Sequence, residues 1–328
     1  MTCHSSTQTF TPSQMLQASA EASLGIEPQD LSPAIMDTGL FRGRLLVREV
    51  QPGLILTAND VICQIDRSIT VEVEPSIVCG IQLEGAPQAM TVDGRHAVAK
   101  KLNAPVIVGY GRRSTCAWTA VPGSHSASVG FTIRPRFFDR FGALVADDGI
   151  AALHDILGRE FHTEVLAPSG QLVERARRVL DHAYTGTLAG LFLESSTLHL
   201  VTEIADQLSR RGALVAALGH RHYDRMMEAR AILDADLIAP PATLELARRV
   251  GTNVTTLQRS FRMAFGTTIF GYVRQQRLSV ARILLVDHGL AVAEAGRKVG
   301  FASPSAFSVA YKQQFGHLPR AAGSGRAG

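Results

Sequence analysis

The chain has 328 residues, of which 46% are hydrophobic and 19% charged, and its formal net charge is +4. This composition is typical of a soluble globular protein of about two domains. No apolar run reaches the ~18 residues of a membrane helix and the N-terminus lacks the features of a secretory signal, so we expect a cytoplasmic protein without a membrane partner.

The first 140 residues divide into an arm and a β-rich region. Residues 1–36 are rich in Ser, Thr, Gln and Ala, which predicts a flexible arm with at most one short helix. Residues 37–140 carry short β-prone runs separated by turn signals such as Pro52-Gly53 and Asp93-Gly94. Regular short strands predict a β-barrel, here a cupin-like, effector-sensing domain.

Helical periodicity begins near Pro135. The stretch "RPRFFDRFGALV" predicts one helix, and Leu172 to Ala183 and Leu188 to Leu208 predict two amphipathic helices that suit domain contact or dimerisation. We therefore assign 141–235 to a helical linker or dimerisation region. An all-α domain is expected over 236–322 and a disordered tail over 323–328, so the predicted fold class is α+β.

Two stretches of the all-α region repeat one pattern about 50 residues apart. Each begins with a good N-cap residue, Asn253 or Ser303, and ends in a glycine suited to a C′ cap, Gly266 or Gly316. The pattern predicts two helices that each bury one face. The apolar residues of these faces recur at i, i+4 and i+8, as Leu257, Phe261 and Phe265 in the first stretch and Phe307, Tyr311 and Phe315 in the second.

A shorter helix precedes each repeat, with a small residue four positions before a glycine: Ala247 with Gly251, and Gly296 with Gly300. This spacing allows a close helix crossing and predicts tandem helix-turn-helix units. Thr243 is expected to cap the first short helix. A connecting helix of about sixteen residues would separate the units by ~24 Å. Allowing for the width of each unit, this suits adjacent major-groove segments ~34 Å apart.

Charge is distributed unevenly between the two halves. From Arg221 to Gly328 there are 15 Lys or Arg and 7 Asp or Glu, a net charge of +8, so the remainder carries −4. A basic module beside a slightly acidic one indicates a polyanionic partner for the basic half, here double-stranded DNA.

Residues from about Thr243 to Arg320 resemble the tandem helix-turn-helix domain of AraC/XylS-type transcriptional regulators. The features that carry the resemblance are "LARRVG", "TLQRSFRMAFG", "RLSVARILL", "VGF" and "SAFSVAYKQQFGHLP". Within that family, "RRVGTNVTTLQRSFRMAFGTTIFGYVRQQRL" is similar to the subgroup that senses ferric siderophores of the pyochelin and alcaligin kind. The resemblance implies a transcriptional activator with a small-molecule effector, RNA polymerase as a partner, and a homodimer as a further expectation.

Three positions of the second unit depart from the family pattern. Gly296 replaces the usual alanine, Val309 a common arginine, and Leu318 the small hydroxyl residue before the proline. The glycine should loosen the second unit by roughly 1 kcal/mol of helix propensity. The valine removes a DNA contact.

The outward faces of the two repeat helices supply the predicted DNA contacts. Gln can pair with adenine and Arg with guanine, so we expect the first unit to discriminate sequence and the second to dock on the backbone. The predicted contacts are Thr255, Thr256, Gln258, Arg259 and Arg262 in the first unit and Ser305, Ser308 and Lys312 in the second.

The β-rich region is expected to bind the effector. Tyr110, Arg112, Arg113 and Trp118 lie together in sequence and combine aromatic with cationic groups, which suits an aromatic anion such as a ferric siderophore. We expect no metal or cofactor of the protein's own, iron entering only as part of the effector. The HxH motif His220–His222 lies in the helical region and is expected at the surface.

Two alternatives remain open. The same regulator could bind a sugar, an aromatic or a drug-like effector. An enzyme with a DNA-binding tail, such as a thiol methyl-acceptor, would need an activated cysteine. Cys63, Cys79 and Cys116 lie in β-like runs and are expected in the core, and no catalytic motif is present, so we predict that the protein is not an enzyme.

Overall fold

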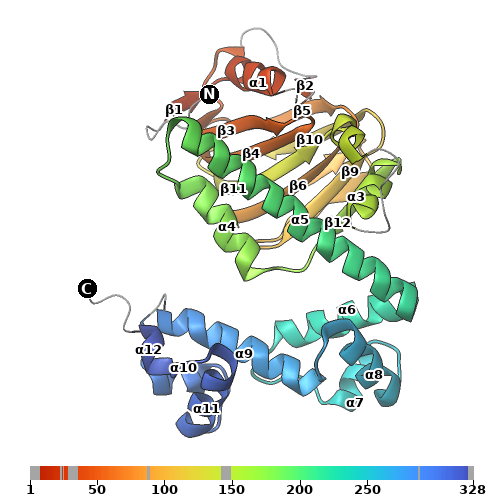
Figure 1. Ribbon diagram of the computed structural model, residues 1–328, viewed down its shortest axis with the longest axis vertical. Coiled ribbons are helices and arrows are strands. Elements are labelled where there is room, and N and C mark those ends of the chain that lie inside the picture. Colours follow the sequence, from red (N-terminus) through yellow and green to blue (C-terminus); the bar gives the residue numbers. More distant parts are fainter. Residues whose placement is uncertain are drawn as a thin grey trace. The chain divides into compact units, whose positions relative to one another are not determined.

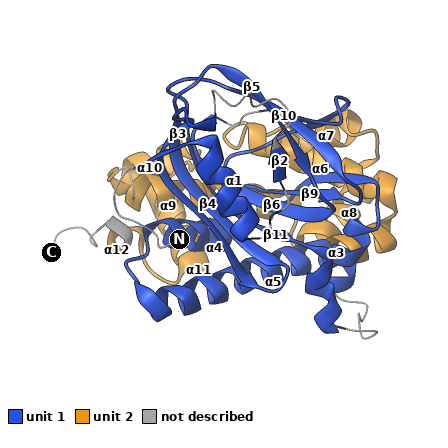
Figure 2. Cartoon of the chain, turned by 90° about the horizontal axis from the view of Figure 1, so that it is seen from above, with its two compact units in different colours: residues 1–210 blue, residues 211–328 orange. Residues whose placement is uncertain are grey.

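The computed structural model divides into two compact units, residues 1–210 and 211–328 (Figure 2). The division falls within the long helix α5, Gly186–Leu218. Residues 324–328 of the expected tail, and the first seven of the expected arm, lie outside the described part of the chain. The described residues are 8–22, 24, 26–28, 36–86, 89–141, 149–286 and 289–323.

Unit 1 contains two antiparallel sheets (Figure 1). The seven-stranded sheet has the order β1-β3-β4-β11-β6-β9-β12, and the five-stranded sheet has the order β2-β5-β10-β7-β8. Their strands are β1 (Gln8–Phe10), β2 (Ile26–Pro28), β3 (Phe41–Gln51), β4 (Leu54–Cys63), β5 (Arg67–Val73), β6 (Ser76–Glu84), β7 (Met90–Val92), β8 (His96–Val98), β9 (Pro105–Tyr110), β10 (Ser114–Ala120), β11 (His125–Ile133) and β12 (Phe161–Val165).

The seven-stranded sheet has two different faces because side chains alternate along each strand. In β6, Ile77, Cys79 and Ile81 belong to the main hydrophobic core. The intervening residues, such as Gly80 and Gln82, line a cavity, which Cys79 also borders. The core face is covered by α3 (Gly149–Leu157), α4 (Gly170–Asp181) and α5 (Figure 1).

The two sheets give the cupin-like architecture expected from the sequence. No ladder joins one sheet to the other within the described strands, so the barrel is open. The segment expected as a flexible arm carries β1, the helix α1 (Pro12–Glu21) and β2. The sheet also continues past residue 140, since β12 pairs with β9.

The segment after Pro135 differs from the expected α-helix. Residues Pro135–Phe141 form the 3₁₀ helix η1, and the rest of the predicted helix lies mostly outside the described residues. Phe137 and Phe138 are both buried, and their rings pack edge to face at 5.7 Å. Two adjacent aromatic residues that are both buried do not fit the single apolar stripe of an amphipathic α-helix.

Unit 2 is all-helical (Figure 1). Two separate hydrophobic cores form, one around Leu257 and Phe261 and the other around Phe307 and Tyr311. The helix α6, which precedes the expected limit at residue 236, supplies Met226, Ala229 and Leu233 to the first core. The helices of this unit are α6 (His220–Ala235), α7 (Thr243–Arg249), α8 (Val254–Phe265), α9 (Ile269–Val286), α10 (Val292–Lys298), α11 (Pro304–Phe315) and α12 (Pro319–Gly323).

The predicted caps of α8 and α11 are confirmed. The Asn253 side chain accepts from the Thr256 amide at 2.8 Å, and Ser303 accepts from the Ala306 amide at 3.2 Å. Gly266 and Gly316 end the helices in the left-handed conformation, with φ of 67° and 80°. The prediction for Thr243 is wrong by one position, because α7 begins at Thr243 and its N-cap is Ala242, which makes no side-chain cap.

Candidate nucleic-acid interface and effector cavity

The helix α8 presents a polar and basic face on the surface of unit 2. Leu257 and Phe261 are fully buried on its other face. The predicted DNA contacts Thr255, Gln258, Arg259 and Arg262 are all exposed, and Thr256 is half-buried. Within the described part of the chain neither arginine forms an ion pair, so both guanidinium groups are available to an anionic partner.

The equivalent face of α11 is less charged. Ser305 and Lys312 are exposed, whereas Ser308 is half-buried and its hydroxyl donates to the Pro304 carbonyl at 2.8 Å. Val309 is 57% exposed, which leaves an apolar side chain in the middle of this face. The helix offers fewer groups for base recognition than α8.

The connecting helix α9 lies between the two helix-turn-helix repeats of unit 2, as predicted. In Figure 1, α8 lies near one end of α9 and α11 near the other. Its residues Tyr272 and Val273 belong to the first core, and Leu278, Ala281 and Leu285 belong to the second. One continuous helix of 18 residues therefore contributes side chains to both cores, which limits the movement of α8 relative to α11.

Polar contacts along α9 strengthen this connection. Arg277 donates to the carbonyls of Leu237 and Ile238 at 2.7 and 2.9 Å and to the Gly300 carbonyl at 3.1 Å. The single guanidinium thus ties the segment before α7 to the turn before α11. Arg274 also donates to Gln313 on α11 at 3.1 Å.

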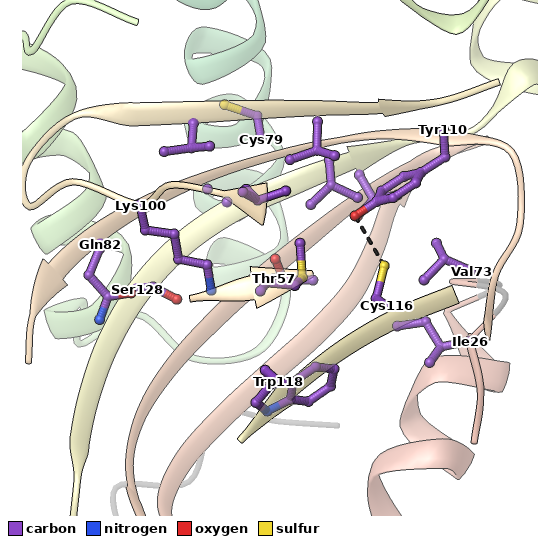
Figure 3. Close-up of a pocket in the computed structure, with 18 of the residues that line it drawn as sticks. Ile26, Thr57, Val73, Cys79, Gln82, Lys100, Tyr110, Cys116, Trp118 and Ser128 are labelled. Carbon is purple, nitrogen blue, oxygen red and sulfur yellow. Dashed lines mark hydrogen bonds between the residues drawn. The ribbon is translucent and has the colours of Figure 1, made fainter. Parts of the chain in front are cut away.

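A cavity of about 310 Å³ lies in unit 1 between the two sheets (Figure 3). One wall comes from β4, β6, β9 and β11, and the other from β2, β5, β7, β8 and β10. Its volume is at the lower end of the ~300–1,000 Å³ of small-molecule sites. Mostly apolar walls with a few polar groups are typical of such sites.

Two of the four predicted ligand residues line this cavity. Tyr110 is buried, and its hydroxyl accepts from the Cys116 thiol at 3.3 Å (Figure 3). Trp118, the only tryptophan of the chain, contributes its half-buried ring. The structure therefore brings together the aromatic members of the predicted set.

The other two predicted residues do not line the cavity. Arg112 pairs with Asp93 at 2.9 Å and Glu160 at 3.0 Å, and its hydrogen bond to Glu160 lowers the pKa of that carboxyl. Arg113 contacts carboxylates of β2, β5 and the following turn, the nearest being Glu72 at 3.3 Å. Both arginines lie in the turn after β9, which carries them away from Tyr110. Their role in ligand binding remains a prediction.

Sequence reasoning missed the polar lining of the cavity. Lys100, Gln82, Ser128 and Thr57 contribute to its walls (Figure 3). Strand alternation could have indicated Lys100, because it has the same parity as the buried Val98 in "HAVAKK". Gly80 lines the cavity beside open space, since a Cβ added there would meet no atom within 4 Å.

The cysteines of the described residues are core groups, as expected. Cys63, Cys79 and Cys116 are buried. Burial raises the pKa of Cys79 to about 12 and also raises that of Cys116. A methyl-acceptor or redox sensor needs an accessible thiolate, which these environments disfavour. Cys3 lies outside the described part of the chain.

Histidines do not form a metal site in the described residues, where no cluster of three potential ligands occurs. His220 of the HxH motif is exposed at the start of α6, as expected, and His222 is half-buried.

Of the described helices, none combines the length and hydropathy that crossing a bilayer requires.

Two family models match the chain. The model of the regulatory protein PchR N-terminal domain covers residues 42–218, and a helix-turn-helix domain model covers residues 246–323. Regulatory protein PchR of Pseudomonas aeruginosa (strain PAO1) is 35% identical over 104 residues, which are 31% of this chain and 35% of that relative. The match thus spans about a third of the relative's length.

Solved structures include two similar DNA-binding proteins. An AraC-type transcriptional regulator from Chromobacterium violaceum is 31% identical, with 32% of this chain and 93% of that chain covered and a TM-score of 0.30. The DNA-binding domain of AdpA in complex with a target DNA is 28% identical, with 30% and 87% covered and a TM-score of 0.28.

Proposed function

This chain belongs to the AraC family of transcriptional regulators and to its PchR-like group, and we propose that it binds an operator through α8 and α11 under control of a small molecule. The carrying observation is that two capped helices expose polar faces while sharing one rigid connecting helix. Such helices enter successive major-groove segments of duplex DNA. RNA polymerase and a second copy of the chain are further proposed partners, and activation is the proposed sign of regulation.

The two recognition helices have different proposed roles. Arg259 and Gln258 can each form bidentate hydrogen bonds with a base edge, worth ~1–3 kcal/mol of discrimination. Ser305, Ser308 and Lys312 on α11 suit phosphate contacts, as do Thr255 and Arg262 on α8. The first helix-turn-helix, which contains α8, then reads most of the operator sequence. The second, which contains α11, fixes the register of the protein on the DNA.

The cavity of unit 1 is the proposed effector site. A ferric siderophore is the favoured effector, supported by the match to the PchR N-terminal domain and by the aromatic groups Trp118 and Tyr110 at the cavity. Iron would arrive within the ligand. The alternative is a sugar, aromatic or drug-like effector in the same cavity.

Control of DNA binding requires that the effector favour one conformation over another. The strands offer a direct connection, because β6 and β11 line the cavity with one face and pack under the helices with the other. In β11, Ser128 and Val129 both border the cavity, and Val129 also belongs to the core that includes Leu193 and Leu200 of α5. A ligand that shifts these strands would move α4 and α5.

Footprinting of the full-length protein tests the proposal. Duplexes selected from a random pool would be probed at near-physiological salt, with and without ferric pyochelin. We expect two protected segments about 10.5 base pairs apart, and an affinity that falls with salt by a slope of about −0.9 per phosphate contact. Failure to enrich any duplex, or protection of a single segment, would contradict the operator model.

A variant of the cavity separates effector control from DNA binding. Gly80→Leu places a side chain in the open space of the cavity without meeting a neighbouring atom at its Cβ. We expect this variant to bind the selected duplex as the wild type does and to lose the response to the effector. An unaltered response would place the effector site elsewhere.

A further inference from the structure

Lys100 is the single charged group among the described residues that line the effector cavity. The other titratable groups on its walls are Tyr110, Cys79 and Cys116. Burial raises the pKa of each of these three, so all remain neutral at physiological pH. The cavity therefore carries one positive charge and no described carboxylate.

Among the described residues, no partner compensates the charge of this lysine. It forms no ion pair or side-chain hydrogen bond with any residue that the structure describes. Its side chain is solvent-accessible, yet it projects into the pocket from the side of Gln82 and Ser128, while Tyr110 and Cys116 stand opposite (Figure 3). Desolvation by the surrounding protein lowers its pKa. An ammonium group in this position can pair with an anionic ligand whose apolar part occupies the mostly apolar cavity.

We propose that Lys100 is the counter-ion of a monoanionic effector, a carboxylate with an apolar body that fills the space between Lys100 and Trp118. This inference rests on the proposed effector role of the cavity. One cation neutralises one carboxylate, whereas a phosphate dianion would leave a second charge uncompensated in an apolar site. The remaining lining groups, such as Thr57 and Gln82, are neutral, and Val71, Val73 and Val108 surround the apolar body.

The only tryptophan of the chain provides the measurement, since Trp118 lines the same cavity. Intrinsic fluorescence of the full-length protein would be titrated with octanoate and with octanamide, its neutral counterpart. We expect octanoate to bind at least about tenfold more tightly, as a charge-assisted hydrogen bond requires. Lys100→Met should reduce that preference below about twofold, with octanamide binding unchanged.

Lys101→Met is the matched control, because Lys101 is the adjacent exposed lysine but does not line the cavity, so its loss should leave the preference intact. Lys100→Arg should retain it because the charge remains. A preference for octanoate that persists in Lys100→Met would overturn the inference, as would the absence of any carboxylate response in the wild type.

The pH dependence gives a second readout that needs no variant. Raising the pH deprotonates Lys100, so octanoate affinity should fall at a lower pH than an ordinary lysine would give, while octanamide affinity stays constant. Equal pH profiles for the two probes would also refute the assignment. The proposed function is judged separately, because DNA binding of the wild type does not depend on either probe.

Discussion

The two helix-turn-helix units of unit 2 pack their short first helix against their second helix with different pairs of residues. In the first unit Ala247 of α7 and Leu257 of α8 are both buried. In the second, Gly296 takes the place of the alanine and Phe307 that of the leucine, and a Cβ on Gly296 would lie 3.0 Å from the Phe307 ring. The loss of a methyl group in one helix is thus matched by a larger side chain in the other. A helix-propensity argument that treats Gly296 alone overlooks this compensation.

The outward faces differ as much as the cores. Gln258, Arg259 and Arg262 make the face of α8 polar and basic, whereas α11 exposes Val309 between a serine and a lysine. The comparison teaches that a repeated scaffold preserves shape while the exposed residues decide what each copy can recognise. The following predictions break or sharpen that difference.

The largest effect is expected for DNA specificity. Gln258→Ala and Arg259→Ala should each reduce discrimination at the contacted base pair by ~1–3 kcal/mol, because each removes a proposed bidentate contact. Val309→Ala and Ser308→Ala should change specificity little. Binding of the selected duplex and of single-base variants would be compared by fluorescence anisotropy at fixed salt. Larger specificity changes in the α11 variants would reverse the proposed division of roles.

An intermediate effect is expected from the packing of the second unit. Gly296→Ala should destabilise it, because overpacking against Phe307 costs ~1–3 kcal/mol and exceeds the helix-propensity gain of ~1 kcal/mol. In a Phe307→Leu background, which copies the first unit, the same change should stabilise it relative to Phe307→Leu alone. Amide hydrogen exchange of α10 and α11 measures both effects. Equal effects in the two backgrounds would rule out the coupling.

The smallest effect concerns two tyrosines that differ in their hydrogen bonds. The buried hydroxyl of Tyr311 has no partner among the described residues, and the first unit has Phe261 at this place. Tyr311→Phe should therefore stabilise the second helix-turn-helix by about 1 kcal/mol.

Tyr272 is the control for that prediction. Its hydroxyl donates to Asp234 at 2.7 Å and accepts from Arg230 at 3.0 Å, so Tyr272→Phe should destabilise the first helix-turn-helix. Thermal unfolding and hydrogen exchange of both variants provide the measurement. Destabilisation by Tyr311→Phe would mean that its hydroxyl has a bonding role in the native protein.

Several features of unit 2 were predictable because they depend on local pattern. The caps, the buried Leu257 and Phe307 and the exposed Arg259 all follow from helical periodicity and terminal residue preferences. The error at Thr243 has a local cause too, because a side chain that can cap does not determine where the chain enters the helix. The contacts of Arg277 with three carbonyls were not predictable, since its partners lie 23 to 40 residues away.

The cavity of unit 1 was much less predictable from the sequence. Tyr110 and Trp118 were selected for their chemistry and do line it, but Arg112 and Arg113, chosen because they are adjacent in sequence, pair with carboxylates outside it. Adjacent residues in a strand and the turn that follows it point in different directions, so sequence proximity is a poor guide to a shared site. The alternation of side chains in β8, continued two residues beyond Val98, would have indicated Lys100.

The sequence by itself determined the helical repeat, the β-rich first half and the polar face of α8, because these depend on the period of side chains along one element. Tertiary structure alone decided which face of each strand meets the cavity and which meets the helices, because that choice depends on how two sheets and three helices pack. The same packing leaves Lys100 without a described partner and removes Arg112 from the cavity by pairing it with Asp93 and Glu160.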